Sequence, residues 1–265
     1  VRAVGLPVAD VPGVEQATSL AEALAGAQAV VAPMAGTDHA GRVAAPLMPE
    51  ADLRLDEAFM AALGPAVPLF IGTLKPAVAR AAAAHRVRVV ELAAVDEIAI
   101  ANSVPTAEGA VQIAMERLPV TIHGSAALVV GFGRCGTTLG RLLAAMGARV
   151  GVVARRAAEL ARAEEMGLVP WPWAALPEAV ADQDVIFNTV PAPVFSRSLL
   201  RRTRADVLIV DIASAPGGTD FQAAEELGRA AVLALGLPGK VAPVTAGRIL
   251  ARYVPELIRT ELERL

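Results

Sequence analysis

Three glycines with the spacing G-x-G-x-x-G stand where an apolar segment passes into a helical pattern. Gly131, Gly133 and Gly136 follow the apolar run that ends at residue 130. In this context the first glycine permits a tight turn, the second lets the backbone approach a phosphate, and the third lets helix and strand pack closely. The following helix N-terminus offers free N–H groups to an anion. We predict that this segment binds the pyrophosphate of a dinucleotide; the alternative is a glycine-rich turn that binds nothing. The predicted contacts are Gly131, Phe132, Gly133, Arg134, Cys135 and Gly136.

The next predicted strand, residues 148–155, ends in two arginines rather than in a carboxylate. An acidic residue at this position would bind the adenosine ribose 2′-hydroxyl of NAD, whereas arginine matches a 2′-phosphate. We therefore predict NADP as the cofactor, bound by Arg155 and Arg156, with Arg155 the stronger candidate because it lies closer to the strand end. The alternative is that both arginines are solvated residues at a helix start.

Cys135, the one cysteine of the chain, lies inside the glycine segment. A helix N-terminus lowers a thiol pKa, so a reactive thiol is one interpretation, and a small residue that fills a tight turn is the other. A single cysteine excludes a disulfide framework. The histidines are scattered without the spacing of metal ligands, so we expect no metal. The net charge of −3 gives no reason to expect nucleic acid, and no apolar run suggests a membrane span.

Short apolar runs alternate with helical patterns along the whole chain, which indicates an α/β protein with parallel sheets. We predict two Rossmann-like three-layer αβα domains with an interdomain cleft. The expected parts are an N-terminal domain at 1–101, a linker helix at 102–119, a cofactor domain at 120–245, and a C-terminal helix at 246–265 that packs on the first domain. Ser103 or Thr106 is expected to cap the linker helix, with Pro105 near its first turn.

Three further predicted strands end in polar or small residues, in the segments NTVPAPVF, DIASAPGGTDF and LGLPGKVAPVTAG. Ligands of open parallel sheets bind at the carboxyl ends of the strands. We expect these segments to surround the nicotinamide half of the cofactor. The predicted contacts are Asn188, Thr189, Val190, Pro191, Ala213, Leu237 and Pro238.

These segments, together with NSVPTAEGAVQIAME and IHGS, closely resemble the A subunits of dipicolinate synthase in order and spacing over nearly the whole chain. The resemblance implies an NADP-dependent dehydrogenase that makes dipicolinate from dihydrodipicolinate or its hydrated precursor. It also implies a partner, the B subunit of dipicolinate synthase, and a cytoplasmic location in the mother cell of a sporulating bacterium. Members of the family usually begin with a further strand and helix, which the chain lacks. By analogy with other Rossmann proteins that have long terminal helices, we expect a homo-oligomer.

A dicarboxylate substrate requires cations or hydrogen-bond donors. The predicted substrate-binding residues are Thr37, Asn102, Ser103, Thr106 and Lys240, with Arg42 and Lys75 as further cations. His123, His39, Ser103 and Thr106 are candidates for the catalytic groups, although His123 is equally consistent with a structural histidine. Two other functions remain open: another NADP-dependent oxidoreductase, of the shikimate or 2-hydroxy acid type, and a non-catalytic protein that binds a nucleotide as part of a complex.

Overall fold

The computed structural model describes residues 1–8 and 10–264. The chain divides into two compact units, Val1–Ile98 together with Leu250–Leu265, and Ala99–Ile249. Each unit is described by itself below.

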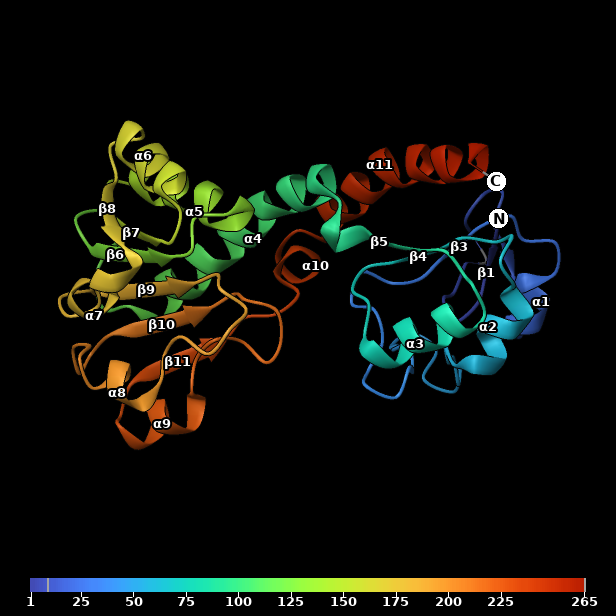
Figure 1. Cartoon of the computed structure of the whole chain (residues 1–265), viewed down its shortest axis with the longest axis horizontal. Helices are drawn as coiled ribbons and strands as arrows, with labels where there is room; N and C mark the ends of the chain where they lie inside the picture. Colours follow the sequence, from blue (N-terminus) through green and yellow to red (C-terminus); the bar gives the residue numbers. More distant parts are fainter. Residues whose placement is uncertain (9, 265) are drawn as a thin grey trace. The chain divides into compact units, whose positions relative to one another are not determined.

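The second unit contains a six-stranded parallel sheet in the order β11-β10-β9-β6-β7-β8 (Figure 1). Within this unit, β6 lies in the middle of the sheet. The strands β7 and β8 extend the sheet to one edge, and β9, β10 and β11 extend it to the other. The topological switch point therefore lies between β6 and β9, where open sheets of this kind bind ligands. The strands are β6 (Ala126–Val130), β7 (Arg149–Ala154), β8 (Val169–Pro172), β9 (Val185–Asn188), β10 (Leu208–Asp211) and β11 (Ala230–Leu233).

Helices cover both faces of this sheet, because successive strand residues point to opposite sides. In β6, Ala127 and Val129 pack into one apolar cluster, and Leu128 and Val130 into another. The first cluster is covered by α4 (Asp96–Arg117), α5 (Arg134–Ala145) and α6 (Ala157–Glu165). The second is covered by α7 (Leu176–Ala179), α8 (Arg197–Leu200) and α9 (Phe221–Glu226). The unit also contains η2 (Trp173–Ala175) and α10 (Leu237–Val241).

The strand β8 was not predicted, because Pro170 and Pro172 lie within it. Proline lacks a backbone N–H and is disfavoured in central strands. In the structure β8 pairs only with β7 and forms the edge of the sheet, where a missing donor is tolerated. The last strand, predicted for residues 229–239, was too long: β11 ends at Leu233, and α10 follows at Leu237.

The first unit is also α/β with parallel strands. Its three-stranded sheet has the order β3-β4-β5, and a separate parallel pair joins β1 to β2. The strands are β1 (Arg2–Ala3), β2 (Glu15–Gln16), β3 (Val30–Val31), β4 (Leu69–Ile71) and β5 (Val89–Glu91). The helices are α1 (Leu20–Leu24), α2 (Glu57–Leu63), α3 (Pro76–Ala84) and η1 (Leu92–Ala94). The α/β class with parallel sheets is thus confirmed.

Helix α11 (Pro243–Glu263) ends the described chain. From Leu250 onward its residues belong to the first unit, where Arg88 donates a hydrogen bond to the Glu261 carbonyl oxygen at 3.2 Å. No helix within the described residues is long and apolar enough to cross a membrane.

The predicted start of the linker helix was wrong. Helix α4 begins at Asp96, so Pro105 lies inside it rather than near its first turn. Ser103 and Thr106 do not cap the helix; their hydroxyls donate to the carbonyl oxygens of Ile100 and Asn102, each at 2.7 Å. Serine and threonine within a helix commonly bond carbonyls of the preceding turn. Pro105 has no N–H for the Ala101 carbonyl oxygen, and the two hydroxyls bond other oxygens.

Candidate nucleotide-binding site

The glycine loop joins β6 to α5 at the switch point of the sheet. Gly131 has φ of +91°, a conformation that residues with a side chain rarely adopt. A Cβ at Gly131 would overlap the hydroxyl of Thr189 and lie 2.9 Å from Val190 Cγ2. A Cβ at Gly136 would overlap the Gly131 carbonyl oxygen, so the first turn of α5 lies directly against the strand end. Both glycines are required by packing.

Gly133 differs from its two neighbours in the motif. A Cβ built there meets no described atom within 4 Å, and Gly133 is the N-cap of α5. The backbone at this position is therefore exposed beside a twelve-residue helix whose first N–H groups lack helical partners. This cradle fits the pyrophosphate of a dinucleotide, because the open space lies where the helix N-terminus favours negative charge.

The two arginines after β7 have different surroundings. Arg156 is the N-cap of α6, and its guanidinium donates from Nε and Nη2 to Glu159 Oε1, at 2.9 and 2.6 Å. The hydrogen bond to Glu159 raises the pKa of Arg156. Arg155 instead lies over the indole ring of Trp173, with its Cζ 5.6 Å from the ring centroid. The sequence did not predict this pairing.

The segments after β9 and β10 are held by buried polar side chains. Asn188 is fully buried; its amide donates to the Val190 carbonyl oxygen at 3.2 Å and accepts from the Val190 N–H at 3.1 Å. Asp211, also fully buried, accepts from the Ala213 N–H, the Gly218 N–H and the Thr219 hydroxyl, at 3.1, 2.8 and 2.7 Å. Asp211 was not predicted, although an acidic residue that ends an apolar strand is visible in the sequence.

These positions refine the predicted nicotinamide contacts. The Asn188 side chain shapes the turn and is not exposed to a ligand. Leu237 is buried in the core against α4, where its Cβ lies 3.1 Å from a Cβ built at Gly109. Thr189, Val190 and Pro191 are the members of this set that leave the carboxyl end of β9 with exposed surface. Contact with a cofactor stays a prediction for Thr189, Val190 and Pro191, and also for Ala213 and Pro238.

The structure argues against a substrate contact for Ser103. Its side chain is fully buried, and its hydroxyl lies 2.6 Å from that of Thr138 in α5. Ser103 therefore ties α4 to α5. The Thr106 hydroxyl is bonded to the Asn102 carbonyl oxygen of its own helix. Asn102 is half-buried in α4 and Lys240 is exposed in α10, and both stay predictions.

His123 does not lie near the glycine loop. It precedes the amino end of β6, where its ring packs against Gly147. The five residues of β6, about 16 Å long, separate it from the carboxyl edge of the sheet. This position argues against a catalytic role for His123 in a reaction at that edge, and the structural interpretation fits its packing.

Cys135 lies partly buried in the first turn of α5. Burial raises the pKa of its thiol, and the nearby Arg134 lowers it by less. Since a raised pKa leaves little thiolate, the structure favours the small residue that fills the turn.

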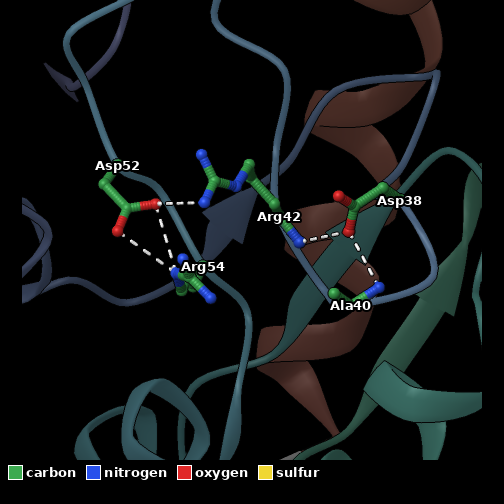
Figure 2. Close-up of polar contacts among 5 residues, drawn as sticks. All are labelled: Asp38, Ala40, Arg42, Asp52 and Arg54. Atoms are coloured by element: carbon green, nitrogen blue, oxygen red, sulfur yellow. Dashed lines mark hydrogen bonds and ion pairs between the residues drawn. The ribbon is translucent and has the colours of Figure 1, made fainter.

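A polar loop follows β3 in the first unit (Figure 2). Asp38 accepts the N–H groups of Ala40 and Arg42 at 2.9 and 2.8 Å, and these bonds hold the pKa of Asp38 below its usual range. Arg42 and Arg54 are opposed across an antiparallel bridge, and both reach Asp52, at 3.7 and 3.2 Å. Two guanidinium groups thus share the Asp52 carboxylate, and the nearby Asp38 carboxylate supplies a second negative charge.

The other predicted residues of the first unit have separate positions. The Thr37 side chain is only 6% exposed, and its hydroxyl donates to the Asp38 carbonyl oxygen at 2.9 Å. Lys75 is the N-cap of α3, and His39 is exposed in the loop after β3. Among the described residues, no group of three or more histidines, cysteines, aspartates or glutamates is placed to hold a metal ion.

Comparison with known proteins first defines the class. Residues 92–216 match the NAD-binding domain of D-isomer specific 2-hydroxyacid dehydrogenases, and residues 1–93 match the N-terminal domain of the A subunit of dipicolinate synthase. The second unit is thus a dehydrogenase-type domain for a nicotinamide nucleotide. The chain is 46% identical to the dipicolinate synthase A subunit of Bacillus subtilis over 190 residues, which span 72% of the chain and 64% of that protein. The chain therefore spans slightly less than two thirds of the length of this relative.

Two solved structures are similar to the chain over most of its length. The A subunit of dipicolinate synthase from Bacillus halodurans has a TM-score of 0.89 and 35% identity, and 97% of this chain and 88% of that one are covered. Its counterpart from Bacillus subtilis gives 0.88 and 37%, with 98% and 89% covered. The chain belongs to the family of dipicolinate synthase A subunits.

Proposed function

We propose that the chain is the NADP-dependent dehydrogenase component of dipicolinate synthase. It would oxidise dihydrodipicolinate, or its hydrated precursor, to dipicolinate (pyridine-2,6-dicarboxylate) during sporulation. Family membership and the dehydrogenase-type domain support this function. The observation that carries the choice of cofactor is the end of β7, where the Arg155 guanidinium, which lies over the Trp173 ring, occupies the position at which NAD-specific domains have a carboxylate.

Residues of the second unit would hold the cofactor. The N–H groups at the start of α5 would bind the pyrophosphate at the open Gly133, and Arg155 would bind the 2′-phosphate with charge-assisted hydrogen bonds. Thr189, Val190 and Pro191 would line the nicotinamide end. Bound NADP would supply the hydride acceptor, and the protein supplies binding and orientation.

The substrate carries two carboxylates, and these require cations. In the first unit, Arg42 and Arg54 share a single carboxylate, so most of their N–H donors stay available to an anion. Lys75 and Lys240 remain candidate cations. Removal of a hydride and a proton from the dihydro substrate produces an aromatic ring, and this product stability lowers the demand on a general base.

The function is tested by incubating the purified chain with NADP and enzymatically generated dihydrodipicolinate. We expect NADPH fluorescence and dipicolinate absorbance to rise together in equal amounts. The assay is run with and without the B subunit of dipicolinate synthase, because the relatives are named as subunits and we propose a complex of the two proteins. Size-exclusion chromatography with light scattering measures that complex and the proposed homo-oligomer.

Two results would contradict the proposal. NADP binding without turnover, whether or not the B subunit is present, would identify a non-catalytic protein that binds the nucleotide as part of a complex. NADPH formation with shikimate or a 2-hydroxy acid, but not with dihydrodipicolinate, would identify a different oxidoreductase.

A further inference from the structure

Trp173 holds a fixed position beside the end of β7. It begins η2 directly after β8, and the parallel pairing of Ala154 with Pro172 sets these two strand ends side by side. The Trp173 side chain packs partly buried against the apolar cluster that contains Val153 and Leu176. A ring anchored in this way is a rigid surface for a neighbouring side chain.

Arg155 lies over this ring, whereas Arg156 does not. The cation–π contact with Trp173 uses no hydrogen-bond acceptor, so the N–H groups of Arg155 stay available to a bidentate anion. The edge of Arg156 is directed at Glu159 instead. No ion pair of Arg155 occurs within the part of the chain that the structure describes. The two adjacent arginines are therefore not equivalent: Arg156 is bonded to Glu159, whereas Arg155 contacts an aromatic ring and is paired with no carboxylate of the described residues.

We propose that Trp173 is a specificity-determining positioning residue, which acts through Arg155 to favour a dinucleotide with a 2′-phosphate. The inference rests on the NADP preference proposed above. A free arginine must lose side-chain freedom when it binds a phosphate, and stacking on Trp173 removes part of that freedom before the ligand arrives. Trp173 need not contact the cofactor itself.

The test is calorimetric titration of the full chain with NADP and with NAD. The variants are Trp173→Leu, which keeps apolar packing without a ring, Trp173→Phe, which keeps a ring, Arg155→Ala, and the double variant Arg155→Ala/Trp173→Leu. Trp171→Phe is the matched control, because Trp171 lies in the same segment but packs over Gly151, with its Nε1 3.3 Å from a Cβ built there.

We expect Trp173→Leu to weaken NADP binding about two- to fivefold, because part of the cost of ordering the Arg155 side chain is then incurred when the ligand binds. NAD binding should stay unchanged, Trp173→Phe should lie closer to wild type, and Trp173→Leu should add nothing once Arg155 is removed. The control Trp171→Phe should keep the wild-type ratio of NADP to NAD affinity.

The outcomes separate the inference from the function on which it rests. If Arg155→Ala abolishes the NADP preference while Trp173→Leu leaves it intact, the inference is overturned and the cofactor proposal stands. An equal loss of NADP and NAD affinity in Trp173→Leu would show a purely structural role and would also overturn it. If Arg155→Ala does not change the NADP to NAD ratio, the inference and the assigned role of Arg155 both fail; the NADP proposal itself fails only if the wild-type chain does not prefer NADP.

Discussion

The hydroxyl of Thr189 lies against the carbonyl oxygen of Gly131, at 3.3 Å, and also 3.0 Å from that of Val130. Thr189 follows β9 and Gly131 follows β6, so one hydroxyl ties together the two strands at the switch point of the sheet. The same hydroxyl occupies the space that a side chain at residue 131 would need.

Thr189→Val should destabilise the second unit by about 0.5–1.5 kcal/mol, because it removes the hydroxyl donor to the Gly131 carbonyl oxygen while side-chain volume is kept; the Val130 carbonyl oxygen still accepts the backbone N–H of residue 189 at 2.9 Å. The glycine loop should also bind the cofactor more weakly. Thr189→Ser retains the hydroxyl and is the matched control. Urea denaturation monitored by circular dichroism measures the change, and equal stability of the two variants would contradict the assigned role of the hydroxyl.

Alanine at each glycine of the motif should separate packing from binding. Gly133→Ala should lower the thermal midpoint by less than Gly136→Ala, since the added methyl meets no described atom within 4 Å and only the poorer N-cap character of alanine costs stability. It should block the cofactor. Gly136→Ala should lower stability, because its methyl overlaps the Gly131 carbonyl oxygen. Differential scanning fluorimetry with and without NADP measures both effects. Normal cofactor binding by Gly133→Ala would argue that the loop does not cradle phosphates.

Asp211→Asn should destabilise the segment 212–219 by about 1–3 kcal/mol. The carboxylate accepts three hydrogen bonds, whereas an amide offers one acceptor oxygen and directs an N–H₂ group at another donor. Hydrogen exchange should show faster exchange at Gly218, whose N–H bonds to Asp211 at 2.8 Å. Unchanged exchange at Gly218 would mean that the backbone alone holds this segment.

Cys135 should react slowly with iodoacetamide at neutral pH. Burial raises the pKa of its thiol, so the reactive thiolate forms only at higher pH than in the unfolded chain. The same shift means that the thiol favours folding at neutral pH and that this contribution declines as pH rises above the unfolded pKa. The chain has one cysteine, so the alkylation rate against pH, measured by mass spectrometry, reports on this residue alone. Reaction as fast as that of the protein in denaturant would favour the reactive-thiol interpretation.

The sequence by itself determined the features that depend on neighbouring residues. The alternation of apolar runs and helical patterns indicated parallel α/β units, since apolar residues recur with different spacings in strands and in helices. The spacing of Gly131, Gly133 and Gly136 located the cradle, because the turn at Gly131 and the close contact at Gly136 require glycine and Gly133 leaves the backbone between them open. The motifs also identified the family to which the chain belongs.

Only the tertiary structure decided which side chains meet across the sheet. Trp173 lies beside Arg155 because β8 pairs with β7. The strand β8 could not be predicted from its sequence because it contains two prolines. Ser103 is buried because α5 supplies Thr138 as a partner, and α4 begins at Asp96 despite an internal proline. His123 lies at the amino edge of the sheet because strand direction, and not residue type, sets the edge at which a side chain lies. Contacts between segments distant in sequence can override local propensity, which is why these positions could not be derived from residue patterns alone.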